Sequence, residues 1–199
     1  MNTKNLRRLI KEEIEIQEIL SKVKRIDNAS DEEIIKILNK ILEETRLKNI
    51  RIDDDGYVNV NGDVDIRSMK LIKIPFYFGV INGDFDCSNN KLTSLHGAPK
   101  RVGGHFRCGF NRLTSLKGVP KKFNREFRCG HNQLTSLVGA PKIVGGIFEC
   151  SNNKLTSLVG APKIVGGNFY CVSNDEKQFT EKDVRRICNV KGKIIVNVY

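Results

Sequence analysis

The sequence predicts an α/β solenoid of about six coils, because one pattern of residues returns at a fixed interval through the middle of the chain. Within this pattern a phenylalanine and a cysteine stand two positions apart, which is typical of a short strand with one buried face. Helical patterns precede the repeats, and a shorter one follows them. Clear copies of 21 residues span 92–112, 113–133, 134–154 and 155–175, and a less regular copy spans 71–91.

A further copy is concealed before these. The segment 61–66 matches the segment 82–87, so residues 50–70 are expected to form a degenerate first coil. We therefore predict three parts: a helical hairpin at 1–49, a solenoid at 50–175 and a C-terminal cap at 176–199. With strands about 4.8 Å apart, six coils give a sheet roughly 25–30 Å long.

The strand side of each coil is expected to build the core. Phe106 and Cys108 alternate with outward neighbours, so both side chains turn inward. The cysteines recur once per coil, which predicts a column of small buried hydrophobic residues instead of disulfides or a zinc site. A recurring asparagine is expected to bond backbone groups where the chain leaves the strand. These columns are Cys87, Cys108, Cys129, Cys150 and Cys171, and Asn90, Asn111, Asn132, Asn153 and Asn174, with Cys188 outside the first.

The return side of each coil is expected to consist of turns. Gly97 and Pro99 predict a turn that leaves no room for a helix, because proline fixes φ and lacks an N–H donor. The double glycine at 103–104 permits a tight bend of the backbone. In one coil Asn124 and Arg125 replace this double glycine, so we expect that coil to bend differently.

Helical segments flank the repeats. Apolar residues with a period near 3.6 predict a helix at 3–26, and a capping box of Ser30 and Glu33 begins a second helix that ends near Thr45. The two are expected to pair with a turn at 27–29, either as a cap on the first coil or as an arm that dimerises or binds a partner. A helix at 180–188, capped by Thr180, and a strand at 193–199 are expected to seal the other end.

The repeat also resembles a known family. The strings FRCGFNRL, FRCGHNQL and FECSNNKL are similar to the L-x-L-x-x-N-x-L core of leucine-rich repeats. The longer pattern LTSLxGAPKxVGGxFxC resembles the short leucine-rich repeats of bacteriophage and related bacterial proteins. The resemblance covers roughly residues 71–175. It implies a curved parallel-sheet solenoid used for binding and names no partner. If the chain is phage-encoded, as the resemblance suggests, a host or phage protein is the expected partner.

The residues that alternate with phenylalanine and cysteine are expected to face outward on the concave face of the sheet. They vary between coils, which suits a recognition surface but is also normal for solvated positions. Aromatic and arginine residues in the set favour binding, since such residues anchor interfaces. Arg107 and Arg128 should be neighbours and favour an acidic group unless glutamates neutralise them. The candidate partner-binding residues are His105, Arg107, Phe110, Glu126, Arg128, His131, Ile147, Glu149, Asn168 and Tyr170.

Basic residues form a second candidate surface. Residues 91–175 hold 13 basic and 3 acidic residues, whereas 50–90 hold 4 and 7, within a chain of net charge +11. Regular lysines can attract nucleic acid through its phosphates, although repetition alone copies lysines and lysine keeps sheets soluble. The candidate residues for an acidic partner or nucleic acid are Lys100, Arg101, Lys121, Lys122, Lys142 and Lys163.

Other functions are disfavoured by the sequence. Asp53–Gly56 fails the spacing of a calcium loop, and the acidic group Asp63, Asp65, Asp84 and Asp86 is expected to couple to His105 and Arg107 instead of a metal. No P-loop, dinucleotide fingerprint or zinc-hydrolase motif is present, so we expect neither a cofactor nor catalytic residues. The chain shows no signal peptide or apolar membrane span, which predicts a cytoplasmic protein.

The leading hypothesis is therefore a non-enzymatic module that binds another protein through the concave face. A basic protein that associates with nucleic acid through its lysine ladders is the alternative, and a structural or self-assembling component held by the helical hairpin is a third. The oligomeric state is left open by the sequence.

Overall fold

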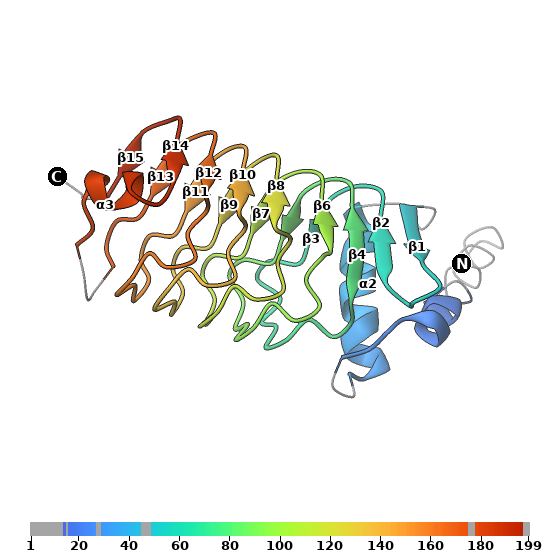
Figure 1. Ribbon diagram of the computed structural model, residues 1–199. Coiled ribbons are helices and arrows are strands. Elements are labelled where there is room, and N and C mark those ends of the chain that lie inside the picture. Colours follow the sequence, from blue (N-terminus) through green and yellow to red (C-terminus); the bar gives the residue numbers. More distant parts are fainter. Residues whose placement is uncertain (1–13, 15, 27–28, 45–48, 175–177, 197–199) are drawn as a thin grey trace.

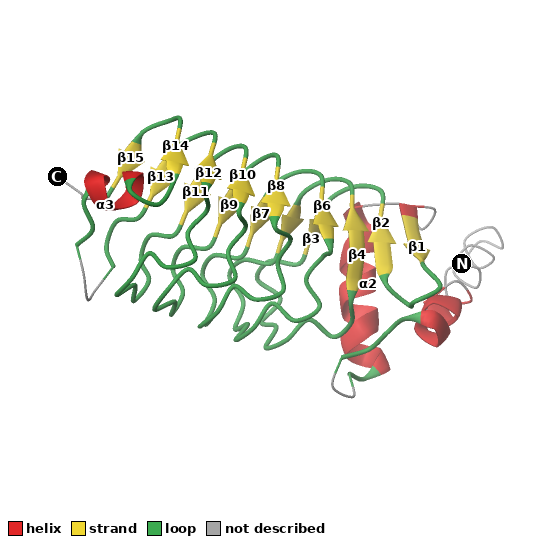
Figure 2. Ribbon diagram, viewed as in Figure 1, coloured by secondary structure: helices red, strands yellow, loops and turns green. Residues whose placement is uncertain are grey.

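The computed structural model describes residues 14, 16–26, 29–44, 49–174 and 178–196. In these residues the chain winds into an elongated β-solenoid of about six turns (Figure 1). The turns lie side by side, and each contributes short parallel strands connected by long loops (Figure 2). The predicted solenoid, its parallel sheet and the concealed coil at 50–70 are confirmed.

One side of the solenoid is a seven-stranded parallel sheet. Its register advances by one repeat per strand, so that Phe106 pairs with Phe85 on one side and with Phe127 on the other. The strand after the last repeat extends this sheet beyond the six predicted coils. In spatial order the strands are β3 (Val64–Asp65), β5 (Phe85–Asp86), β7 (Phe106–Arg107), β9 (Phe127–Arg128), β11 (Phe148–Glu149), β13 (Phe169–Tyr170) and β15 (Ile194–Ile195).

The return side also forms sheets, which the sequence analysis did not predict. Their signal was the apolar residue that follows each proline turn, such as Val102, which is buried while Arg101 before it is exposed. Two four-stranded sheets result. One contains β1 (Ile50–Ile52), β2 (Val58–Val60), β4 (Phe78–Ile81) and β6 (Arg101–Val102), and the other β8 (Lys122–Phe123), β10 (Ile143–Val144), β12 (Ile164–Val165) and β14 (Asn189–Val190).

The boundary between these two sheets falls at the coil that lacks the double glycine. Elsewhere the paired glycines allow backbones of adjacent coils to approach closely: a Cβ added to Gly103 would collide with the Asn82 carbonyl, and one on Gly166 with the Gly145 carbonyl. Asn124 carries a Cβ at the equivalent position, and in the described residues β6 and β8 form no ladder. The double glycine thus serves close stacking, whereas the left-handed turn belongs to Gly97, with φ of +89°.

Phenylalanine and cysteine columns fill the interior. The rings of Phe85, Phe106, Phe127, Phe148 and Phe169 stack from coil to coil with centroids 5.1–5.9 Å apart. All six cysteines are free and buried, in agreement with the prediction. Burial raises the pKa of the column thiols of Cys87, Cys108, Cys129 and Cys150, so these groups are neutral packing elements.

The asparagine column satisfies buried backbone groups, as predicted. The Nδ2 of Asn132 donates to the carbonyls of Cys108, Cys129 and Gly130 at 3.1–3.2 Å. Its Oδ1 accepts the N–H of Leu113 at 2.9 Å. The column includes Asn90, Asn111, Asn153 and Asn174, and its members are buried. Each asparagine ties two successive coils together at the point where the strand ends.

The N-terminal region differs from the predicted hairpin. The first helix ends at Lys22, before the predicted end at residue 26, and residues 23–26 are extended against the solenoid. The Lys24 N–H donates to the Gly56 carbonyl, and the backbones of Arg25 and Phe76 form an isolated antiparallel β-bridge. Residues 1–13 and 27–28, which include part of the predicted helix and turn, lie outside the described residues. In this segment, backbone hydrogen bonds to the first coils therefore replace the helical hydrogen bonds that the sequence pattern predicts.

The second helix, α2 (Asp31–Glu44), lies beside the first coil. The capping box is confirmed, because the Glu33 N–H donates to Ser30 Oγ and the Ser30 N–H donates to Glu33 Oε2. The apolar side chains of α2 join the common core, and the helix contacts β3. Of the predicted first stripe, Leu20 and Val23 are buried and Ile19 is partly buried, whereas Ile14 is 63% exposed.

The C-terminal residues add to both sides of the solenoid. Helix α3 (Glu181–Arg185) has the predicted N-cap Thr180, whose hydroxyl accepts the Asp183 N–H. The helix is shorter than predicted, because Asn189 and Val190 form β14 beside β12. The predicted terminal strand is present as β15, and residues 197–199 lie outside the described residues.

Candidate functional site

The outward side chains of the seven-stranded sheet form the first predicted site. Arg107 and Arg128 are register partners on β7 and β9, so the predicted neighbours do lie side by side. Each has its own carboxylate: Arg107 Nη1 lies 3.0 Å from Asp84 Oδ2, and Arg128 Nε lies 2.7 Å from Glu126 Oε2. The face therefore does not offer two uncompensated arginines to an acidic ligand.

The two carboxylates are held in their ionised forms. Burial alone would raise the pKa of Asp84, but hydrogen bonds from the His105 N–H and the Arg107 guanidinium outweigh it and lower that pKa. The hydrogen bond from Arg128 lowers the pKa of Glu126, and His105 Nδ1 lies 3.7 Å from the same carboxylate. The expected coupling of the acidic group to the next coil is thus confirmed for Asp84.

Four further candidates on this face are half-buried, namely Ile147, Glu149, Asn168 and Tyr170. The Oε2 of Glu149 accepts the Gly130 N–H at 3.0 Å, so this side chain supports the backbone of the neighbouring coil. Asn168 Nδ2 donates to the Tyr170 hydroxyl at 3.0 Å. These side chains line the face, but their polar groups are occupied by the protein itself.

Phe110 and His131 are the candidates most open to a partner. Their rings are stacked with centroids 4.0 Å apart and planes 11° apart, and Phe110 is 58% exposed. The N–H of Phe110 donates to the Gly130 carbonyl, and that of His131 donates to Ser151, so the backbone beneath both rings is fixed. The structure confirms that the pair lies on the bend that follows the strands, where it forms a rigid exposed aromatic platform.

The backbone at this bend is left-handed in every coil. The residue at this position has a φ angle between +52° and +59°. We call these residues the left-handed column; they are Ser68, Asn89, Phe110, His131, Asn152 and Ser173. Asparagine tolerates this conformation better than most residues do. Histidine also tolerates it, and His131 Nε2 lies 3.2 Å from Asn152 Nδ2. Phenylalanine has no such tolerance, so the left-handed backbone is costly at Phe110, whose ring stacks on His131.

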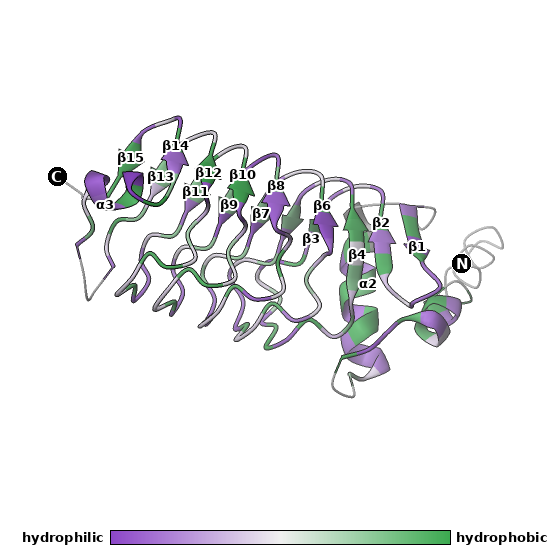
Figure 3. Cartoon of the chain, viewed as in Figure 1, coloured by the Kyte–Doolittle hydropathy of each residue, from purple (hydrophilic) through white to green (hydrophobic). Residues whose placement is uncertain are grey.

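The basic residues of the second predicted site are exposed and stacked. The Lys142 N–H donates to the Lys121 carbonyl at 2.7 Å, and the Lys163 N–H donates to the Lys142 carbonyl at 2.8 Å. Arg101 and Lys122 project from β6 and β8. These two strands each begin with a hydrophilic residue, whereas the next strands, β10 and β12, are apolar (Figure 3). No ion pair involves these basic residues in the described part of the chain.

Lys100 belongs to an aromatic cluster that the sequence analysis missed. Its Nζ lies 3.2 Å from the ring centroid of Tyr57, and Lys24 Nζ lies 5.2 Å from the rings of both Tyr57 and Tyr77. The Tyr77 hydroxyl and His96 Nε2 are 2.7 Å apart. The cluster combines side chains from the N-terminal segment and three coils, so no local sequence motif could have revealed it.

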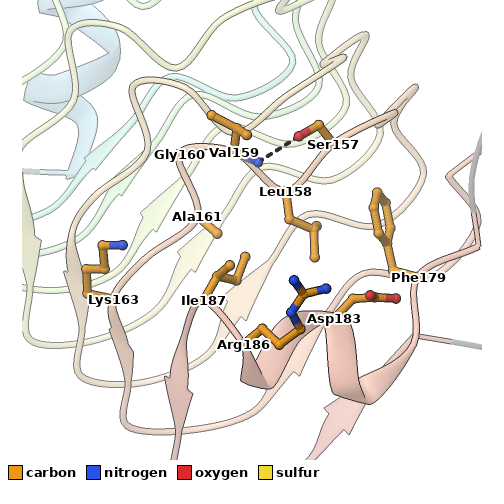
Figure 4. A pocket seen from close by; sticks show the side chains of 10 residues that line it. All are labelled: Ser157, Leu158, Val159, Gly160, Ala161, Lys163, Phe179, Asp183, Arg186 and Ile187. Carbon is orange, nitrogen blue, oxygen red and sulfur yellow. Dashed lines mark hydrogen bonds between the residues drawn. The ribbon is translucent and has the colours of Figure 1, made fainter.

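Near the C-terminus, a pocket of about 600 Å³ lies between the last full coil and α3. Figure 4 shows Leu158, Phe179 and Ile187 around it, with Asp183 from α3 and Arg186 from the C-cap of that helix beside them. Asp183 also serves the helix cap, accepting from Thr180. Val159, which also lines the pocket, is 66% exposed. The sequence analysis did not predict this pocket, because its walls come from segments that only the fold brings together.

The residues of the acidic group Asp63, Asp65, Asp84 and Asp86 are occupied within the fold. Asp63 accepts the Asp84 N–H, Asp65 pairs with Arg67, and Asp86 accepts from Ser88. In the described residues no three His, Cys, Asp or Glu side chains converge as metal ligands would. No helix within the same residues is long and apolar enough to cross a bilayer.

No known protein family, curated protein or solved structure matches this chain.

Proposed function

We propose that the protein is a non-enzymatic binding module that grips another protein through the outer face of the seven-stranded sheet. The exposed stack of Phe110 and His131 carries this proposal, because it is a rigid aromatic surface in which Phe110 is 58% exposed. Aromatic side chains give large contact areas at low entropic cost and are enriched among interface anchors. The family resemblance suggests a host or phage protein as the partner.

The charges of the face refine the partner's chemistry. Arg107 and Arg128 are compensated by Asp84 and Glu126, so an acidic group has little net attraction to them. A partner that places an apolar or aromatic group over Phe110 and His131, with polar groups beside the charged pairs, fits this face better. Desolvating the intact pairs costs less than burying an unpaired arginine would.

We also propose that the solenoid is of the leucine-rich-repeat kind and that its ends are capped. The buried asparagine column supports the first part, because it stands where the repeat family has its asparagine. The contact of α2 with β3 and of α3 with β15 supports the second part. Such covers shield core residues at the end coils of solenoids.

The test replaces the two rings with a residue type that occurs elsewhere in the left-handed column. The double substitution Phe110→Asn and His131→Asn removes the rings but keeps side chains that this column accepts at residues 89 and 152. Partners are captured from the native host with the tagged full chain and identified by mass spectrometry. We expect the double variant to lose the partner at unchanged thermal stability.

The control is the double substitution Ser68→Asn and Ser173→Asn, which changes both ends of the same column. It should retain the partner. Retention of the partner by the ring-less variant at wild-type level would refute the placement of the binding site.

A second candidate function is association with nucleic acid through the lysine ladders. It is favoured by the exposed Lys121, Lys122, Lys142 and Lys163, which form no ion pair in the described part of the chain, and by the aromatic cluster beside Lys100. Binding of nonspecific DNA or RNA at low salt, falling steeply as salt rises, would support it. Absence of binding even at low salt would eliminate it.

A further inference from the structure

The sheet β1-β2-β4-β6 carries a polar pocket on its outer face, which shares Arg101 with the basic surface and lies apart from the seven-stranded sheet. Its volume is about 520 Å³. Amide and guanidinium side chains predominate, and valines supply its apolar wall. We call it the amide-arginine pocket; it is lined by Asn49, Arg51, Asp53, Asn59, Val60, Asn61, Val80, Asn82 and Arg101.

The base of the pocket is rigid because Asn59 is fully bonded. Its Oδ1 accepts the Val80 N–H at 2.7 Å, and its Nδ2 donates to the Tyr57 carbonyl at 3.0 Å and to Asp53 Oδ2 at 3.3 Å. Gly79 makes this possible, since a Cβ there would collide with the Asn59 amide. The glycine thus leaves room for an amide inside the irregular pairing of β2 with β4.

A second amide pair leaves hydrogen-bonding capacity open. Asn82 Nδ2 donates to Asn61 Oδ1 at 3.0 Å. This single bond uses one amide's nitrogen and the other's oxygen. The side-chain Nδ2 of Asn61 and Oδ1 of Asn82 form no hydrogen bond within the described chain, and both residues are exposed. One donor and one acceptor, held side by side, can serve a ligand hydroxyl, which both donates and accepts.

The charges of the pocket favour an anion. Arg51 on β1 and Arg101 on β6 flank it, and neither forms an ion pair with any carboxylate in the described chain. Asp53 is already used: its Oδ1 accepts the Tyr57 N–H at 2.8 Å and its Oδ2 accepts from Asn59. The lining therefore contains two arginines without an ion pair in the described chain and one carboxylate that is satisfied by the protein.

The pocket's size and lining narrow the anion to a phosphate ester. One arginine can satisfy a carboxylate by itself through two parallel hydrogen bonds, whereas a phosphate offers three acceptor oxygens to two guanidiniums. The volume exceeds that of a bare ion and is within the range of small-molecule sites. Few apolar groups line it, so the remainder of the ligand is expected to be rich in hydroxyls.

We propose that the amide-arginine pocket binds a sugar phosphate, with the phosphate held by Arg51 and Arg101 and the sugar hydroxyls bonded by Asn61 and Asn82. The sugar phosphate can be free or part of a nucleotide, because both share this chemistry. The proposal is independent of protein binding at the opposite sheet.

The experiment is calorimetric titration of the full chain with ribose 5-phosphate, adenosine 5′-monophosphate, ribose and inorganic phosphate. Ribose 5-phosphate should bind at least tenfold more tightly than ribose or inorganic phosphate. Tighter binding of the nucleotide than of ribose 5-phosphate would identify a nucleotide as the source, and the reverse a free sugar phosphate. No binding of either ester at millimolar concentration would overturn the proposal.

Variants locate the site. Arg51→Gln and Arg101→Gln should each weaken ribose 5-phosphate at least tenfold, whereas Arg112→Gln, an exposed arginine of the repeat outside the pocket, should leave it unchanged. Asn82→Ala should reduce the preference for ribose 5-phosphate over inorganic phosphate. An equal loss in the Arg112 variant would show general attraction to a basic surface and refute a built site.

Discussion

At the scale of single residues, the protein separates side chains that build the coil from side chains that face solvent. Buried asparagines illustrate the first kind, because each amide replaces hydrogen bonds that the backbone loses where a strand ends. Phe110 and His131 illustrate the second kind, because they occupy left-handed positions that the fold fills elsewhere with asparagine or serine. A costly residue at an exposed position points to recognition more strongly than an ordinary exposed residue does.

The asparagine column yields the first prediction. Asn132→Ala would leave the Leu113 N–H without a partner in the interior, while the carbonyls of Cys108 and Cys129 would keep only the bonds from Asn111 and Asn153. A buried unsatisfied group costs about 1–3 kcal/mol, so we expect a loss of about 1–3 kcal/mol in the free energy of unfolding. Urea denaturation measures it, with the exposed Gln133→Ala as the control. A loss equal to that of the control would show that water replaces the amide.

The charged pairs predict how stability depends on pH. The pKa values of Asp84 and Glu126 are lowered in the folded protein, so their contribution is present above the unfolded pKa of about 4 and disappears as pH falls through the folded values. The double variant Asp84→Asn and Glu126→Gln should be about 1 kcal/mol less stable at pH 7. This difference should shrink between about pH 5 and pH 2. Thermal unfolding across that range checks it, and a constant difference would contradict the pairing.

At the scale of elements, the sequence predicted what repeats and missed what depends on stacking. The strand of Phe106 and the Asn111 column were readable because each coil repeats their local chemistry. The return-side strands are two to four residues long, and they exist because backbones of neighbouring coils approach closely. The aromatic cluster and both pockets join segments far apart in the chain, so their residues carried no common motif. The bend at the Phe110 site was predicted, but its left-handed backbone was not.

The double glycine gives a prediction at the element scale. Gly166→Ala should push the coil of β12 away from that of β10, because the new Cβ collides with the Gly145 carbonyl. We expect a loss of about 2–3 kcal/mol, in the range of overpacked sites. Asn124→Ala, at the equivalent repeat position, should change stability by less than about 0.5 kcal/mol. Chemical denaturation of the two variants measures the difference, and equal effects would reject the stacking role of the glycine.

At the scale of the whole molecule, the break between β6 and β8 divides the return side while the seven-stranded sheet runs through. Stability in a solenoid is close to a sum over coils and their neighbours, so an interface with fewer hydrogen bonds is a place where unfolding can stop. The columns of Phe106 and Phe127 still cross this interface, with centroids 5.3 Å apart. Strand pairing therefore joins the two halves on one side only, and on the other side the ring of Phe123 in β8 packs against Phe106.

Buried cysteines allow this division to be measured. Cys87 and Cys108 lie before the break and Cys129, Cys150 and Cys171 after it, all inaccessible in the folded protein. In the Gly166→Ala variant, partly denaturing urea should expose the three later thiols to alkylation before the two earlier ones, because only the later coils are weakened. Mass spectrometry of labelled peptides gives the order. Simultaneous labelling of all five would show that the phenylalanine column and the continuous sheet alone make the solenoid one cooperative unit.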